Sequence, residues 1–198
     1  MTALGSGRLE REVLAGGKLK GGIFRSHIAW LQERHPDRAN DLWTELPPEA
    51  TETLSGVILA SSWYPFEWLI RIDRAILAMF GDDDPDLLPE LGSYSAKINL
   101  STTYRVFDRY TNHEFFLNSA LLHRQFQDFG SVRYEKTGDT SGVMIHTEYP
   151  CFSRVFCESA VGYYEQCVAN HGGKSPQVRE TECQCFGDPS CSFDIRWT

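Results

Sequence analysis

Three cysteines and one glutamate near the C-terminus have the residue types and spacing of a metal site. Cys157 falls on a predicted helix, Glu180 and Cys183 on a predicted strand, and Cys191 at the start of the next strand. A hairpin would bring Cys183 and Cys191 together, and the helix packed on it would add Cys157. Three thiolates and a carboxylate complete a tetrahedral zinc site with no position for water, which is typical of a structural zinc.

The same residues are also compatible with ordinary core packing, because free cysteine is among the most buried residue types. In a regular strand Glu180 and Cys183 face opposite sides, so a bulge or a strong twist is needed for both to bind one ion. Without it, Cys185, which shares a face with Cys183, would be the ligand in place of Glu180. Cys151 and Cys167 have no partner at metal spacing, and we expect them to be plain thiols.

The histidines do not favour a haem site. The chain has six of them but no Cys-x-x-Cys-His motif, and none stands out within an apolar helical stripe. His123, beside Leu121 and Leu122, is the best candidate among them. We therefore expect no haem.

Aromatic residues predict either a ligand pocket or a plain aromatic core. Pockets are mostly apolar with a few polar anchors, whereas aromatic stripes on helices more often pack in the core. The polar anchors would come from the first predicted hairpin. The residues predicted to bind a ligand, a hydrophobic or aromatic small molecule, are Trp63, Phe66, Tyr104, Phe107, His123, Tyr134 and His146.

Length and charge limit the class of protein. A chain of 198 residues is long enough for one domain with its own core. The 27 acidic against 19 basic residues give a net charge of −8, which argues against nucleic acid as a direct partner. The N-terminus has no continuous apolar run, and the apolar stretch at 68–80 is interrupted by charges, so we expect neither an export signal nor a membrane span. We therefore expect a cytoplasmic protein whose cysteines are reduced.

The order of predicted elements indicates an α+β fold, with N-terminal helices followed by a ββαββ unit that forms a small antiparallel sheet. Residues 1–20 are rich in glycine and are expected to form a flexible tail ending in one short strand, and residues 21–198 a single domain. Hydrophobic periodicity predicts helices at 23–35, 65–80, 87–110, 114–129 and 152–169, and strands at 132–136, 142–146, 177–186 and 191–197. The segments 41–43, 46–49 and from 55 onward are predicted to form short helices joined by a proline turn.

Two parts of the chain resemble known families. The segment from Cys157 to Trp197, with CESAVG at 157–162 and ETECQCFGDPSCSF at 180–193, resembles the vinyl-reductase-type small-molecule-binding domain. That module is similar to the sensor domains of phenol- and xylene-responsive transcription activators, and distantly to haem-nitric-oxide sensors. The remainder, with SWYPFE at 62–67 and YRVF at 104–107, resembles an uncharacterised paralogous family abundant in myxobacteria.

The resemblance implies a ligand-sensing function. In the aromatic-sensing activators three Cys and one Glu hold a zinc, and this pattern falls on Cys157, Glu180, Cys183 and Cys191. A sensor domain would signal to a separate, unknown protein partner, and the related sensors suggest a homodimer.

Two other classes of function remain open. An interaction adaptor would use the same fold with a filled core. An enzyme acting on a hydrophobic small molecule is less favoured, because the chain lacks a Gly-rich phosphate loop, a Gly-x-Ser-x-Gly elbow and a His-Glu-x-x-His helix.

Overall fold

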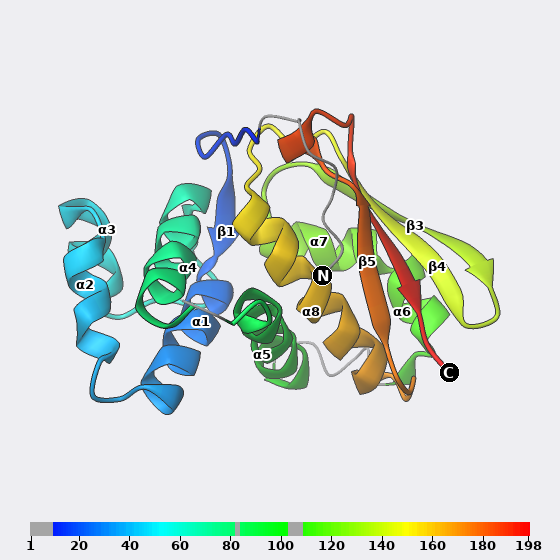
Figure 1. The fold of residues 1–198 in the computed structure, drawn as a ribbon, viewed down its shortest axis with the longest axis horizontal. Coiled ribbons are helices and arrows are strands. Elements are labelled where there is room, and N and C mark those ends of the chain that lie inside the picture. Colours follow the sequence, from blue (N-terminus) through cyan, green and yellow to red (C-terminus); the bar gives the residue numbers. More distant parts are fainter. Residues whose placement is uncertain (1–9, 82–83, 103–108) are drawn as a thin grey trace.

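The chain folds into a group of helices packed against one four-stranded sheet (Figure 1). The computed structural model describes residues 10–81, 84–102 and 109–198. The helices before the sheet are α1 (Gly21–Arg34), α2 (Leu42–Glu45), α3 (Pro48–Leu54), α4 (Phe66–Phe80), α5 (Leu87–Thr102), α6 (Asn112–Leu117) and α7 (Ser119–Phe126). The mixed α+β class predicted from the sequence is confirmed.

The sheet follows from alternating strands and short turns. Its strands are β3 (Ser131–Gly138), β4 (Ser141–Thr147), β5 (Gln177–Glu182) and β6 (Cys191–Arg196), antiparallel in the order β3-β4-β6-β5. Helix α8 (Arg154–Asn170) connects the two hairpins and lies on one face of the sheet (Figure 1). This is the ββαββ unit expected from the sequence.

The helix predicted at 114–129 is two helices, α6 and α7. Helix α6 begins with a capping box, in which the Glu114 carboxylate accepts the Thr111 backbone N–H at 2.8 Å. It ends at Asn118, whose side-chain amide donates to the Glu114 carbonyl oxygen at 2.8 Å. Asparagine side chains compete with the backbone for such carbonyls, which explains the break between the helices.

The N-terminal segment differs from the expected flexible tail. Strand β1 (Lys18–Lys20) pairs with β2 (Trp63–Pro65), where the sequence predicted only a helix start. The Arg11 N–H donates to the Cys185 carbonyl at 2.9 Å, and Val13 bridges Phe152. Residues 11–20 are therefore fixed against the domain by long-range backbone pairing, which local glycine content does not reveal.

Helices α5 and α8 approach each other closely at two glycines. A Cβ on Gly92 would lie 1.8 Å from the Ser159 carbonyl oxygen, and one on Gly162 would lie 1.8 Å from the Pro89 carbonyl oxygen. Both distances are far below van der Waals contact, so only glycine allows this packing. The close approach sets the position of α8 between the helices and the sheet.

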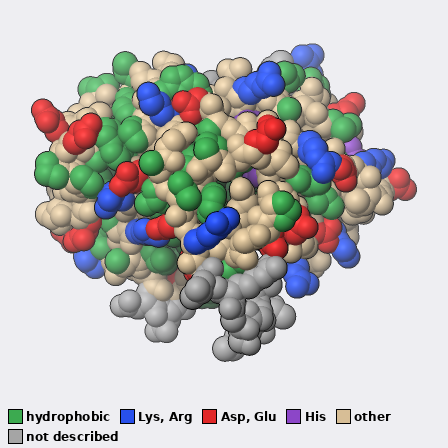
Figure 2. Space-filling model, turned by 90° about the horizontal axis from the view of Figure 1, so that it is seen from above, with side chains coloured by type: hydrophobic (Ala, Val, Ile, Leu, Met, Phe, Trp, Pro, Cys, Tyr) green, Lys and Arg blue, Asp and Glu red, His purple; other side chains and the backbone are tan. Residues whose placement is uncertain are grey.

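The surface is mixed in character. Figure 2 shows acidic and basic side chains interspersed among apolar ones on the face seen from above. Among the described residues, none of the helices combines the length and the apolarity needed to cross a bilayer.

Candidate ligand cavity and metal cluster

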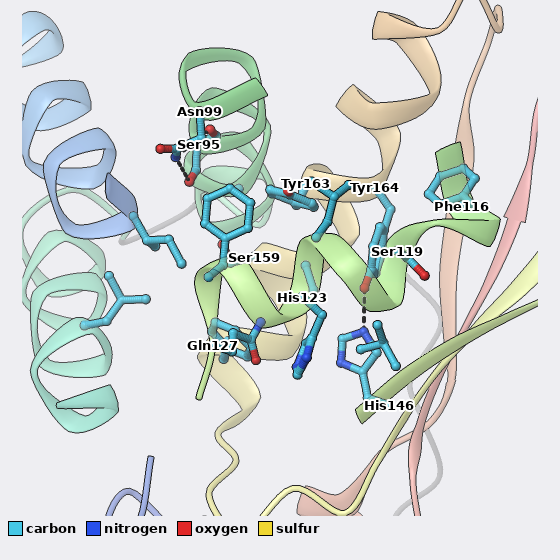
Figure 3. A pocket seen from close by; sticks show the side chains of 18 of the residues that line it. Ser95, Asn99, Phe116, Ser119, His123, Gln127, His146, Ser159, Tyr163 and Tyr164 are labelled. Atoms are coloured by element: carbon cyan, nitrogen blue, oxygen red, sulfur yellow. Dashed lines mark hydrogen bonds between the residues drawn. The ribbon is translucent and has the colours of Figure 1, made fainter. Parts of the chain in front are cut away.

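A cavity of about 110 Å³ lies between the helices and the sheet (Figure 3). Helices α1, α4, α5, α6, α7 and α8 and strands β3 and β4 contribute to its walls. Its lining is mainly apolar and aromatic, and includes Leu69, Phe115, Phe116, Leu122, Phe126, Val132, Phe156, Ala160, Tyr163 and Tyr164. An apolar cavity with a few polar side chains is the usual form of a small-molecule site.

One group of polar residues in the lining consists of histidines bonded to tyrosines. His123 Nε2 is 3.0 Å from the Tyr149 hydroxyl, which donates to Gln127 Oε1, so His123 Nε2 must donate in turn. His146 Nε2 is hydrogen-bonded to the Tyr164 hydroxyl at 2.5 Å, a contact drawn in Figure 3. Burial lowers the pKa of His123 to about 4 and that of His146 to about 3, so both imidazoles are neutral at pH 7.

The lowered pKa of His123 predicts a loss of stability in acid. Its pKa is about 4 in the folded protein and about 6.5 when unfolded, so the unfolded chain binds more protons between these values. The contribution of His123 to the free energy of unfolding is therefore fully present above pH 6.5. It decreases as the pH falls towards 4, by up to about 1.4 kcal/mol per pH unit. Urea unfolding at pH 7 and pH 5 should show a smaller difference for His123→Gln than for the unmodified protein. If both proteins lost the same stability between pH 7 and pH 5, the pKa of His123 would not be lowered in the folded protein.

A second polar group lines the cavity from α1 and α5. Ser95 Oγ is 2.9 Å from Ser26 Oγ, and the Asn99 side-chain amide donates to both hydroxyls and to the Ser95 carbonyl. His27 also lines the cavity, and its Nδ1 is 2.6 Å from Asp73 Oδ1. His27 and Asp73 are 2% and 0% exposed.

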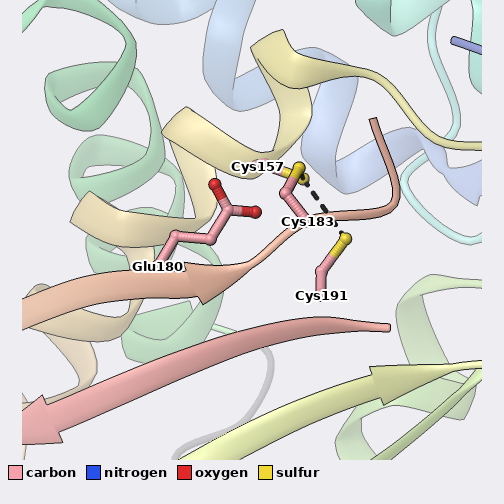
Figure 4. A group of neighbouring side chains, drawn as sticks. All are labelled: Cys157, Glu180, Cys183 and Cys191. Atoms are coloured by element: carbon pink, nitrogen blue, oxygen red, sulfur yellow. Dashed lines mark hydrogen bonds between the residues drawn. The ribbon is translucent and has the colours of Figure 1, made fainter. Parts of the chain in front are cut away.

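The four predicted metal ligands lie together beside the sheet (Figure 4). The ligand atoms of Cys157, Glu180, Cys183 and Cys191 are all within 4.8 Å of one another, and all four residues are buried. The Cys157 sulfur is 3.7 Å from that of Cys191 and 3.8 Å from that of Cys183. The hydrogen bond with Cys157 lowers the pKa of Cys183, which gives this sulfur the thiolate character that a metal ligand needs.

Strand β5 has the irregularity that Glu180 requires. Its pairing with β6 shifts register between Glu180 and Glu182, so Glu180 and Cys183 reach the same point. Glu180 is also paired with Arg154, while its Oε1 is buried without a hydrogen-bond partner among the described residues. The alternative ligand, Cys185, is buried in a short 3₁₀ helix, Gln184–Phe186.

The predicted ligand residues are only partly brought together. His123 and His146 line the cavity. Trp63 is exposed beside Lys20, Phe66 packs in the core against Phe129, and Tyr134 stacks on Phe116 behind the cavity wall. The predicted positions Tyr104 and Phe107 lie outside the described residues.

Three polar residues of the cavity lining, His27, Ser95 and Asn99, were not predicted from the sequence. A signal for His27 was present, since Phe24, His27 and Leu31 follow helical spacing and place His27 in the buried stripe of α1. Its partner Asp73 is 46 residues away on α4, and no local pattern links the two.

The cavity and the cluster of Cys157, Glu180, Cys183 and Cys191 share structural elements. Cys157 and Tyr164 are both on α8, two turns apart, and His146 on β4 is paired with Cys191 on β6. A displacement of α8 or of the β4–β6 pair therefore changes both the cavity and the cysteine cluster.

Comparisons with known proteins support the fold. A scan against protein-family models and a search of curated proteins give no match. Among solved structures, an H-NOX protein from S. oneidensis in the Fe(II)NO state has a TM-score of 0.71 and 14% identity, and the match covers 90% of this chain and 99% of that one. An oxygen-binding H-NOX domain related to soluble guanylate cyclases, in its oxygen complex, gives a TM-score of 0.65, 15% identity and coverages of 90% and 95%.

A third structure concerns haem directly. It comes from work on modulating haem redox potential through protein-induced porphyrin distortion. It matches with a TM-score of 0.62 and 14% identity, over 89% of this chain and 99% of that one. The expectation against haem is corrected by these comparisons, because solved proteins with this fold carry haem. It rested on the absence of a local sequence motif, whereas a ligand histidine can be supplied by the tertiary fold. At these identities the likeness concerns the architecture, and the chain has the fold of H-NOX domains.

Proposed function

We propose that this protein is a sensor domain that binds a small, largely apolar molecule in the cavity between α5, α7, α8 and the sheet. The observation that carries the proposal is the cavity itself, about 110 Å³ in volume, with apolar walls and buried histidines. An engineered protein cavity of about 150 Å³ binds benzene. The volume therefore suits a molecule of about one ring, in keeping with the aromatic ligands that the resemblance to aromatic-sensing activators implies.

A structural zinc at Cys157, Glu180, Cys183 and Cys191 is the second part of the proposal. Supporting it are the four buried donors within 4.8 Å and the resemblance of residues 157–197 to a zinc-containing module. Three thiolates and a carboxylate leave no open position, so the metal would join α8 to β5 and β6 and take no part in chemistry.

Signalling requires that the ligand favour one of two arrangements of the protein. Helix α8 is the element best placed to transmit such a change, because it lines the cavity through Ala160 and Tyr164 and carries Cys157. We propose that a separate protein, or a second copy of this chain, reads the position of α8. The adaptor alternative requires a filled core, and the cavity argues against it.

Haem is the second candidate ligand, favoured by the neutral imidazoles of His123 and His146 at the cavity wall. Neutral imidazole is the form that binds iron, and His123 keeps an unprotonated Nδ1 when its Nε2 donates to Tyr149. The donors therefore fit haem, and the cavity of about 110 Å³ is sized for about one ring. The helices would have to separate to admit haem, which would supply an iron for binding a diatomic gas.

Native mass spectrometry and absorption spectra of protein purified without chelator test these proposals together. We expect one zinc per chain, and a copurified or added one-ring molecule in the cavity. A haem absorption band from protein made with haem supplied, lost in His123→Ala or His146→Ala, would favour the haem reading. Absence of zinc, haem and any bound small molecule, with no binding of benzene or phenol, would contradict the sensor proposal.

Filling the cavity should abolish binding. Ala160→Leu adds three carbon atoms to the α8 wall, and the expected loss of affinity for a one-ring ligand is tenfold or more, because overlap must be relieved by moving side chains. Ala120→Leu adds the same atoms to an exposed position on α7 and serves as the control. Calorimetric titration with phenol measures the effect. Equal affinities in the two variants would exclude this cavity as the binding site.

A further inference from the structure

Arg154, the first residue of α8, contacts the acidic member of the cysteine cluster. Its Nη1 donates to Glu180 Oε2 and lies 4.0 Å from the Cys183 sulfur. Its Nε donates to the carboxylate of Glu158, one turn further along α8, at 2.9 Å. The central carbon of the guanidinium also lies 5.6 Å from the centroid of the Phe186 ring. The guanidinium is therefore held by two carboxylates and an aromatic ring.

The two oxygens of the Glu180 carboxylate have different surroundings. Oε2 accepts from Arg154, whereas Oε1 is buried without a hydrogen-bond partner among the described residues. A buried carboxylate oxygen without a partner is costly, and the ion pair through Oε2 does not remove that cost. Figure 4 shows the carboxylate extending from β5 towards the three sulfurs. A metal ion bound among these sulfurs would supply the partner that Oε1 lacks.

The charge of Arg154 also suits this position. In the metal-bound form, three thiolates and one carboxylate carry four negative charges, of which a zinc ion offsets two. Excess negative charge in a buried cluster is unfavourable, and the guanidinium offsets part of it. Arginine can also bind two carboxylates at once, because its planar head carries five N–H donors in a fixed arrangement.

We propose that Arg154 is a positioning residue of the metal site, which binds Glu180 Oε2 and thereby holds Oε1 towards the zinc ion. This inference rests on the proposed structural zinc and makes Glu180, and not Cys185, the fourth ligand. Replacing an outer-shell residue that orients a metal ligand typically weakens metal binding by roughly 10- to 100-fold.

The test measures the zinc affinity of the full chain by competition with a chromophoric chelator. Arg154→Met removes the charge and the hydrogen bonds but keeps a long side chain, and we expect zinc to bind about tenfold more weakly or worse. Arg154→Lys keeps the positive charge and should recover part of the loss. Arg179→Met is the matched control, because Arg179 is the exposed neighbour of Glu180 on β5, and its affinity should be unchanged.

Cobalt(II) absorption gives a readout that a loss of packing alone would not change. Cobalt(II) bound in place of zinc absorbs visible light strongly when it is four-coordinate, and weakly when water enlarges its coordination shell. We expect strong bands in the unmodified protein and in Arg179→Met. The bands should be weaker in Arg154→Met, because a loosened Glu180 lets water reach the ion.

A Glu180→Gln background shows whether Arg154 acts through Glu180. It also remains measurable if Arg154→Met alone does not fold, because no buried carboxylate is left unpaired. Adding Arg154→Met to Glu180→Gln should weaken zinc binding by at most about threefold, since the two residues act as a unit. A loss of about tenfold or more in this background would overturn the positioning role.

The outcomes separate this inference from the proposed zinc site. Zinc affinity and a cobalt spectrum in Arg154→Met equal to those of the unmodified protein would overturn the role of Arg154 and leave the zinc site intact. An unmodified protein that binds neither zinc nor cobalt would overturn both.

Discussion

Replacing Cys183 with Ser is expected to release zinc and to lower the melting temperature by about 10 °C. A metal bound about a thousandfold above its dissociation constant stabilises the folded state by about 4 kcal/mol, and each kcal/mol shifts the melting temperature by roughly 2–4 °C in a domain of this size. Cys183 belongs to the cluster, because its sulfur lies 3.8 Å from that of Cys157, and its pKa is lowered by that contact. Thermal unfolding with zinc analysis of the same samples measures both effects.

A matched control separates metal loss from the cost of burying a hydroxyl. Cys167 is a fully buried free cysteine outside the cluster, so Cys167→Ser should be destabilised without losing zinc. Comparing Glu180→Gln with Cys185→Ser identifies the fourth ligand, since only the true ligand's replacement should weaken zinc binding. Equal melting temperatures for Cys183→Ser and Cys167→Ser, with no zinc in the unmodified protein, would show that the cysteines of the cluster are ordinary core residues.

Gly92→Ala is expected to destabilise the protein by about 3 kcal/mol. The new Cβ would meet the Ser159 carbonyl oxygen at 1.8 Å, and a backbone atom cannot move aside as a side chain can, so α5 and α8 must separate. The better helix propensity of alanine offsets only about 1 kcal/mol. Because Gly92 and Ser159 both line the cavity, ligand affinity should change as well.

Denaturant unfolding measures the loss of stability, and Gly56→Ala provides the comparison. A Cβ on Gly56 would have only the Thr53 carbonyl oxygen nearby, at 3.8 Å, so this substitution should be close to neutral. A Gly92→Ala protein as stable as Gly56→Ala would show that the two helices are not packed as closely as described.

The sequence by itself determined the features that depend on local pattern. The ββαββ order of the four-stranded sheet and α8, the hairpins around residues 138–141 and 187–190, and the candidate metal ligands on adjacent elements follow from periodicity, turn residues and spacing. The need for a bulge near Glu180 was also foreseeable, since strand alternation alone would separate Glu180 from Cys183.

Only the tertiary structure decided how distant residues meet. The cavity, the pairing of His27 with Asp73 and the attachment of residues 11–20 depend on contacts between segments far apart in sequence. Aromatic residues such as Phe66 and Tyr134 carry no local sign of whether they line a cavity or fill the core, because the same burial stabilises both arrangements. The expectation against haem was wrong for a related reason: a cofactor site is assembled by the fold, and a chain with this fold need not contain a contiguous motif.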